Sequence, residues 1–304
     1  MLSKNEIKGH ASMLSANIMW GLMSPFVKLA ILSGMVTPLI ITNLRIVGAM
    51  VLFWITSFFQ PKENVPFKDL VRLFGAALLA IVFNQGCFIY GVGLSSPMDA
   101  SIITTSMPLW AMLLAAIILK EPISTLKVGG IIIGAAGALL LICGSNHVAE
   151  SGNNYLLGNL LVMTAQISYS FYLVGFKNFV NKYSLVTVMK WMFTFATICV
   201  VPFSYEQIIE TKWTELPWHV IGAIVFTVVG ATYFAYSLIV VGQKNLRPTV
   251  AGMYNYFQPI VACLVAVILG MDSFTPMKVL AVLLIFSGVF LVTKSKRRNN
   301  EDKE

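Results

Sequence analysis

The stretch that decides the fold is MDASIITTSMPLWAMLLAAIIL, residues 98–119, because a second version of it follows at residues 249–270 as TVAGMYNYFQPIVACLVAVILG. Both are apolar, and each carries a proline, Pro108 or Pro259, at the same place. Further identities occur at the same offset of 151 residues: Ala100 and Ala251, Lys127 and Lys278, Gly137 and Gly288. Apolar helices match by chance more often than other segments, so the matched prolines are the stronger evidence. The chain therefore contains two copies of one unit.

The composition around this repeat is that of a membrane protein. Of 304 residues, 57% are hydrophobic and only 11% are charged, and the mean hydropathy is +0.80. A soluble domain of this size keeps about a quarter of its residues charged. Most of the surface must therefore face lipid, and no stretch is polar enough to form a separate soluble domain.

Ten stretches are apolar and long enough to cross a bilayer, which takes about 20 helical residues. The expected spans are 10–32, 37–59, 70–92, 98–119, 125–144, 155–175, 185–204, 217–240, 248–270 and 275–293. The fold class is then an all-α polytopic membrane protein. Residues 1–9 are polar and the first apolar run is long enough to span, so we expect no cleaved signal peptide.

The distribution of Lys and Arg predicts the orientation. With a cytoplasmic N-terminus, 16 of these residues fall on the inner side, and only Lys212 and Lys278 fall outside. This bias follows the positive-inside rule and predicts that both termini are cytoplasmic. The net charge of +8 is explained in the same way and gives no support to nucleic-acid binding.

Each copy contains five spans, so the second copy must enter the membrane from the opposite side. We place the copies at residues 1–146 and 147–304. Inverted repeats of this kind are typical of transporters, in which two related halves exchange conformations around a site near mid-membrane. A channel is a less favoured alternative, because the inverted repeat points to alternating access.

The segment Glu121-Pro122-Ile123-Ser124, followed by the glycines between 129 and 137, resembles the signature of the drug/metabolite transporter superfamily, EamA type. Trp20-Gly21 in the first span and Arg45 in the second also fit that pattern. In the second copy Asp272 and Ser273 replace the Glu-Pro pair. The resemblance implies a ten-helix carrier of the inner membrane, often an exporter of amino acids or other small metabolites.

Amides and aromatic residues recur within the spans and form the candidate substrate site. At an offset of 149 residues, Asn17 and Trp20 align with Gln166 and Tyr169, so both copies place an amide and a ring on one helix face. The other candidates are Asn84, Gln85, Thr104, Tyr233, Tyr236, Tyr254, Asn255 and Gln258. These residues can line a cavity, or the amides can join helices and the aromatics anchor them at the interface.

Three charged residues in or near spans need a reason, because such groups are costly in a membrane. Arg45 either binds a substrate carboxylate, or it bonds backbone carbonyls or reaches the outer interface. Lys190 is expected to reach the inner interface. Asp99 is expected to be an exposed acid at a helix N-terminus. No acid is expected deep in a span, which disfavours proton or sodium coupling through a buried carboxylate.

Pro108 and Pro259 are expected to kink their helices in mid-span, either as hinges or as static bends. Gly130 and Gly134 permit close contact with another helix, within the chain or in a dimer. The chain is thus expected to be a monomer or a homodimer.

The chemistry-bearing residues do not form an enzyme-like pattern. The three histidines are scattered, and Cys87, Cys143, Cys199 and Cys263 lie in or near spans without a CxxC motif. We therefore expect no catalytic residues, metal or cofactor. The sequence predicts a secondary carrier of small organic metabolites in the cell membrane, with lipophilic drugs or lipid-like compounds as the alternative substrates.

Overall fold

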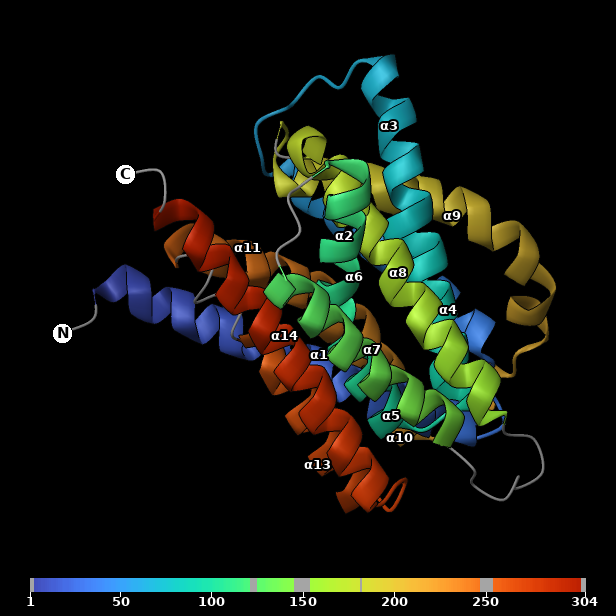
Figure 1. Ribbon diagram of the computed structural model, residues 1–304. Helices are drawn as coiled ribbons and strands as arrows, with labels where there is room; N and C mark the ends of the chain where they lie inside the picture. The colour runs from blue at the N-terminus through green and yellow to red at the C-terminus, as the bar shows by residue number, and fades with distance from the viewer. Residues whose placement is uncertain (1–2, 121–124, 145–153, 181, 247–253, 302–304) are drawn as a thin grey trace.

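The computed structural model describes residues 3–120, 125–144, 154–180, 182–246 and 254–301, and these residues form helices and connecting turns without a strand. The helices are α1 (Lys4–Leu32), α2 (Pro38–Phe58), α3 (Phe67–Ala77), α4 (Asn84–Leu94), α5 (Pro97–Thr104), α6 (Met107–Ile118), α7 (Thr125–Gly144), α8 (Tyr155–Val180), α9 (Leu185–Glu210), α10 (Trp218–Val225), α11 (Ala235–Asn245), α13 (Phe257–Ile268) and α14 (Pro276–Glu301). Figure 1 shows them packed in one bundle.

Among the described residues, seven helical stretches are long and apolar enough to cross a membrane, so the chain is a polytopic membrane protein. Shorter apolar helices occupy 128–140, 257–268 and 276–291, within the other three expected spans. The start of the expected ninth span, 248–253, lies outside the described residues. Ten crossings and the cytoplasmic position of the termini stay predictions.

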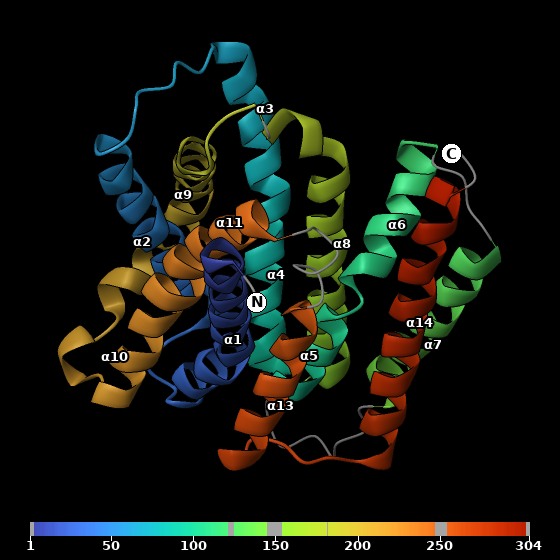
Figure 2. The same cartoon turned by 90° about the vertical axis from the view of Figure 1, so that its left-hand side faces the viewer.

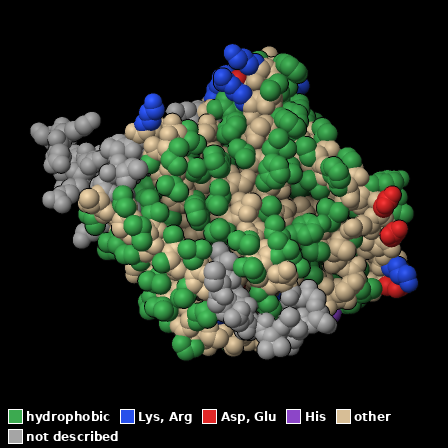
Figure 3. Space-filling view, turned by 45° about the vertical axis from the view of Figure 1, so that its right-hand side comes forward, with side chains coloured by type: hydrophobic (Ala, Val, Ile, Leu, Met, Phe, Trp, Pro, Cys, Tyr) green, Lys and Arg blue, Asp and Glu red, His purple; other side chains and the backbone are tan. Residues whose placement is uncertain are grey.

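The surface of the bundle is apolar where lipid would contact it. In Figure 3 hydrophobic side chains cover the visible face, and charged side chains lie near its edges. Large exposed hydrophobic residues include Phe58, Phe203 and Trp218. A soluble protein rarely exposes so much contiguous apolar surface.

Several expected spans are not single regular helices. A π-helical segment, Leu78–Phe83, joins α3 to α4, and a second, Phe226–Phe234, joins α10 to α11. The last six residues of the second segment align with the first at the repeat offset of 151. The fourth expected span is broken at Thr105 and Ser106, between α5 and α6. π-Helical turns are rare and occur often at functional sites.

The two halves of the chain interlock instead of forming separate bodies. The most extensive helix contacts each join one half to the other: α1 with α11 and α13, α2 with α9, α4 with α8, and α7 with α14. Figure 2 shows α6, α7 and α14 on one side of the bundle and α1, α2, α10 and α11 on the other.

The α7–α14 contact shows what Gly130 and Gly134 do. A Cβ placed on Gly288 of α14 would lie 2.6 Å from the carbonyl oxygen of Gly130 and 2.7 Å from Cα of Gly134. Gly137 is the repeat partner of Gly288, and a Cβ placed on it would lie 2.9 Å from the carbonyl oxygen of Ala281. The close contact that these glycines permit is therefore internal to the chain.

Candidate functional site

Polar and aromatic side chains from six elements meet in the interior of the bundle. This group, called the central cluster below, consists of Trp20, Arg45, Gln85, Tyr169, Tyr172, Thr232 and Tyr236. Five of its members were predicted site residues, one on each of five helices: Trp20 on α1, Arg45 on α2, Gln85 on α4, Tyr169 on α8 and Tyr236 on α11. Tyr172 and Thr232 were not predicted.

Arg45 is the charged member of the central cluster. It is 3% exposed, so it does not reach the surface. Its Nε donates a hydrogen bond to Oγ1 of Thr232, 3.0 Å away, and its Nη1 has no hydrogen-bond partner in the described part of the chain. Among the described residues no carboxylate forms an ion pair with it. The guanidinium therefore offers free donors and an uncompensated positive charge.

The π-helical segment before α11 positions the partner of Arg45. Thr232 donates its own hydroxyl to the carbonyl oxygen of Thr227, five residues earlier, at 2.8 Å. With that proton committed, the Thr232 oxygen is oriented to accept from Arg45. A local irregularity of the helix thus fixes the direction of the guanidinium.

Gln85 and Tyr236 complete the polar part of the cluster. Gln85 follows the other π-helical segment and is 3% exposed, and neither its amide nitrogen nor its oxygen makes a hydrogen bond of good geometry with the described residues. Tyr236 lies close to both Arg45 and Gln85. A buried amide whose hydrogen-bonding capacity is largely unused is costly, so its presence here favours a ligand-binding role.

Rings enclose these polar groups. Trp20 meets the Tyr236 ring edge-on at 5.7 Å and donates from Nε1 to the carbonyl oxygen of Ala231 at 3.0 Å. Tyr169 lies 5.6 Å from Tyr172, and both are near Tyr236. The cluster can therefore bind an anionic group at Arg45 and an apolar body against the ring faces.

Two of the predicted amides join helices and do not line the cluster. Asn17 is fully buried, accepts at Oδ1 from Gln258 at 2.7 Å, and donates to the carbonyl oxygen of Met13. Asn84 donates to the carbonyl oxygen of Ala165 at 2.9 Å. For these residues the structure favours the helix-joining interpretation.

Three of the remaining candidates are also engaged elsewhere. Thr104 donates to the carbonyl oxygen of Ala100 in its own helix. Tyr233 pairs with Thr56, and Tyr254 with His10. Gln166 is buried and Asn255 is half-buried.

The two prolines, which were predicted to kink their helices in mid-span, each lie near the start of a helix, directly after an irregular stretch of backbone. Pro108 is the second residue of α6, and Pro259 is the third residue of α13. At these positions a backbone N–H has no partner within the helix, so proline costs nothing there. The irregular backbone precedes each proline, at Thr105 and Ser106 in the first copy and in the 3₁₀ turn Tyr254–Tyr256 in the second.

The prediction that Asp99 is exposed was wrong, because this carboxylate at the end of a span is buried. The Asp99 side chain is 1% exposed, and its Oδ1 lies 3.0 Å from Nζ of Lys278. Lys278, which is predicted to lie on the outer side of the membrane, is 7% exposed, and it also contacts Oδ1 of Asp272 at 2.5 Å. These three residues are called the Asp99 cluster below.

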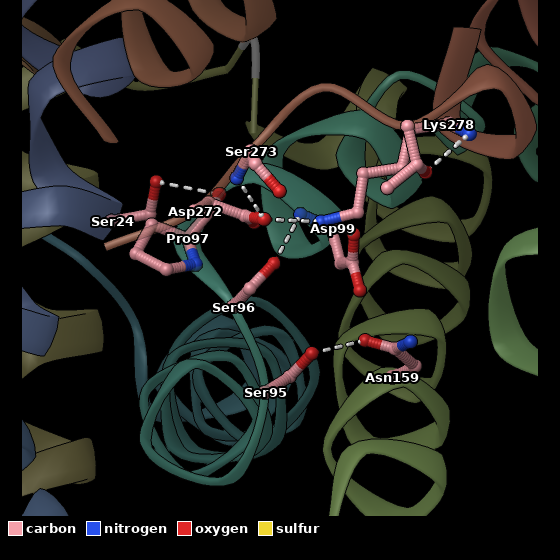
Figure 4. A network of polar contacts seen from close by, with 10 residues as sticks. Ser24, Ser95, Ser96, Pro97, Asp99, Asn159, Asp272, Ser273 and Lys278 are labelled. Atoms are coloured by element: carbon pink, nitrogen blue, oxygen red, sulfur yellow. Dashed lines mark hydrogen bonds and ion pairs between the residues drawn. The ribbon is translucent and has the colours of Figure 1, made fainter. Parts of the chain in front are cut away.

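Figure 4 shows the Asp99 cluster among neutral hydrogen-bonding groups. Ser96 caps α5 by accepting from the Asp99 backbone N–H at 3.0 Å. Ser95 donates to Oδ1 of Asn159. A sequence signal for this cluster did exist, because Lys278 aligns with Lys127, and Asp272 with Glu121 of the signature segment. Polar residues at span ends are so common that this alignment alone does not indicate a buried cluster.

Lys190, which is predicted to reach the inner interface, contacts an aromatic ring. Its Nζ lies 5.0 Å from the centre of the Trp54 ring, and the side chain is half-buried. This cation–π contact is separate from the central cluster.

Comparisons with known proteins agree with this architecture. A relative from Archaeoglobus fulgidus, named only as an uncharacterized transporter, is 25% identical over 91% of this chain and 95% of its own length. The inner membrane transporter YedA of Escherichia coli K12 is also 25% identical, over 92% of this chain and 88% of its own. A solved crystal structure is similar with a TM-score of 0.62 at 19% identity, covering 95% of this chain and 98% of that one, which shows the fold alone.

The family model of the EamA-like transporter family matches twice, at residues 7–143 and 156–294. The two matches together cover most of the chain, and the relatives are named as transporters, which supports membrane transport as the function. This chain is a multi-pass membrane protein that belongs to the EamA-like transporter family.

Proposed function

We propose that this protein is a secondary carrier for small organic molecules that bear a carboxylate, such as amino acids. The observation that carries the proposal is Arg45, a buried guanidinium without a carboxylate partner in the described part of the chain. A buried charge is stable only when it is compensated. A substrate carboxylate would supply that compensation and could bond in bidentate fashion.

The ring faces around Arg45 support a substrate with an apolar part. Trp20, Tyr169, Tyr172 and Tyr236 come from three helices of both halves. A site between two halves that can move relative to each other is what alternating access requires. The inner membrane is the proposed location, in line with the printed name of the YedA relative, and export is the proposed direction.

Counterflow in proteoliposomes tests this proposal. Vesicles preloaded with pooled amino acids or other small carboxylic acids should take up the same labelled compound in a saturable way. Arg45→Gln should reduce this exchange at least tenfold, the scale of one charge-assisted hydrogen-bond pair at about 1.5–3 kcal/mol. Arg45→Lys keeps the charge without the bidentate geometry and should lose less.

A matched control is Lys190→Gln, which removes a cation of the spans outside the central cluster. This variant should keep the exchange. Saturable carboxylate exchange that persists in folded Arg45→Gln protein would contradict the assigned role of Arg45. Transport of the amide analogues as fast as the acids would do the same.

The aromatic lining favours one second candidate, a carrier of lipophilic compounds. Four rings surround a single charge in the central cluster, which leaves room for a substrate held mainly by ring contacts. In that case, Arg45→Gln would leave transport of neutral lipophilic dyes intact, and Trp20→Ala would abolish it.

A further inference from the structure

The Asp99 cluster joins the two halves of the chain through buried charges. Asp99 lies in the first turn of α5, Asp272 in the turn after α13, and Lys278 in the first turn of α14. Nζ of Lys278 contacts one oxygen of each carboxylate, at 3.0 Å for Asp99 and 2.5 Å for Asp272. The side chains of the three residues are at most 7% exposed. Water has little access to any of them (Figure 4).

The charges in this cluster do not balance. Two ionised carboxylates with one ammonium would leave one net negative charge in a dry site. The second oxygens, Oδ2 of Asp99 and Oδ2 of Asp272, accept no hydrogen bond from the described residues. Two carboxylates at one site disfavour each other's ionisation, and an uncompensated buried charge is costly. One proton on either carboxyl would remove the excess charge.

The other titratable groups around the cluster do not supply the positive charge that would balance the second carboxylate. Lys28 of α1 donates to the carbonyl oxygens of Gly93 and Ser95, both at 2.8 Å, and it makes no ion pair with Asp99 or Asp272. Cys263 of α13 faces the cluster, and its neutral thiol adds no positive charge. From α8 the neighbour is Asn159, which is neutral and bonded to Ser95.

The geometry favours a proton over a metal ion. The Lys278 ammonium already lies between the two inner oxygens, so a second cation there would meet a like charge. Metal ions such as Mg²⁺ or Ca²⁺ also need about six or more oxygen ligands. No group of three His, Cys, Asp or Glu residues able to hold a metal occurs in the described part of the chain. A proton needs only one free carboxylate oxygen.

We propose that Asp99 and Asp272 together bind one proton, and that this proton is the coupling ion of the carrier. In the closed form, one carboxyl is protonated and the other pairs with Lys278. When the halves separate at this end, water reaches the carboxyl, which releases the proton and becomes a carboxylate. The coupling part rests on the proposed carrier function, whereas proton binding can be tested without any substrate.

Infrared titration of the full-length protein in vesicles, without substrate, tests proton binding. The wild type should keep one protonated carboxyl C=O band at neutral pH, where exposed acids are ionised. Asp99→Asn and Asp272→Asn should each lose this band, because the remaining carboxylate then has Lys278 to itself. Asp69→Asn is the matched control: Asp69 is a buried acid at the other end of the bundle, and its removal should leave the band in place.

The two single variants probe the same proton independently, so one that does not fold leaves the other as a test. Absence of a protonated carboxyl in the wild type at neutral pH would overturn the proposal. A band that survives in both variants would overturn it as well, because the proton would then belong to another group.

A transport assay tests coupling separately. A pH gradient should drive accumulation of the carried compound in the wild type. In Asp272→Asn the ratio of accumulation with the gradient to counterflow without it should fall at least tenfold. Accumulation unchanged in Asp272→Asn would overturn the coupling. If the wild type shows no counterflow with any compound, the proposed function fails and the coupling with it. Proton binding is still decided by the infrared band.

Discussion

Two ion-pair clusters join the halves of this protein at opposite ends of the helical stretch 67–94, and they differ in how much water reaches them. Near its start, Asp69 of α3 accepts from Nζ of Lys182 at 2.6 Å and from the hydroxyl of Tyr183 at 2.5 Å. The Lys182 side chain is 56% exposed. Beyond its end, the Lys278 side chain in the Asp99 cluster is 7% exposed. The pairing chemistry is the same, but one lysine is in contact with water and the other is buried.

The difference implies that the two ends of the bundle separate with unequal ease. An exposed ion pair is weak because water and salt compete with it. A buried pair is costly to break, because each charge left behind lacks both its partner and water. A surface hollow of about 540 Å³ lies beside the Asp69 cluster, lined by Arg72, Gly175, Phe176, Phe179 and Lys182. We therefore expect the end at Asp69 to open more readily than the end at Asp99.

The largest expected effect is that of Lys278→Met. This change leaves Asp99 and Asp272 buried without their ammonium, at a cost of roughly 3 kcal/mol or more. The melting temperature of the detergent-solubilised protein should fall clearly, as followed by size-exclusion chromatography after heating. Adding Asp272→Asn to Lys278→Met should recover part of the loss, because it removes one of the two carboxyl groups that share the buried site without their ammonium. An unchanged melting temperature would show that the buried pair does not hold the halves together.

The features that could be predicted from the sequence are those with local signals. Spans follow from apolar runs, and the repeat follows from the matched Pro108 and Pro259. Trp20, Arg45 and Tyr169 could be placed in the interior because large polar or charged groups within a span need a partner there. The structure places these three side chains in the central cluster, whereas the sequence left open whether Arg45 reaches the outer interface.

The features that could not be predicted depend on contacts between distant parts of the chain. Asp99 and Lys278 each look like an ordinary polar residue at a span end, and only the fold brings them together. Asn17 and Gln258 have the chemistry of cavity-lining residues, yet they bond to each other. The π-helical segments have no recognisable pattern of their own, so the position of Thr232 beside Arg45 was not foreseen.

A smaller effect is expected from Lys182→Met, the matched change at the exposed end. Because the lysine is half in water, its loss should lower the melting temperature much less than Lys278→Met does. High salt should reduce the difference in melting temperature between wild type and Lys182→Met, because salt screens exposed ion pairs. The difference in melting temperature between wild type and Lys278→Met should stay nearly unchanged. A salt response of equal size in both variants would remove the distinction between a wet and a dry end.

The smallest and most specific effect concerns pH. The hydrogen bond to Asp69 raises the pKa of Lys182 above its ordinary value of 10.5, and the pKa of Tyr183 is raised by its hydrogen bond to the same carboxylate. A lysine whose pKa is raised by folding stabilises the protein fully below the unfolded value, and the contribution is lost as pH rises through the folded value. The difference in melting temperature between wild type and Lys182→Met should therefore be constant from about pH 6 to 9 and narrow only above about pH 10.5. In the Asp99 cluster, by contrast, the proposed proton is bound in the folded chain and absent from the unfolded chain above the ordinary pKa of Asp, so the melting temperature of the wild type should fall relative to that of Asp272→Asn as pH rises from about 5. Parallel curves for both pairs would show that the two clusters titrate alike, and the comparison between the ends would fail.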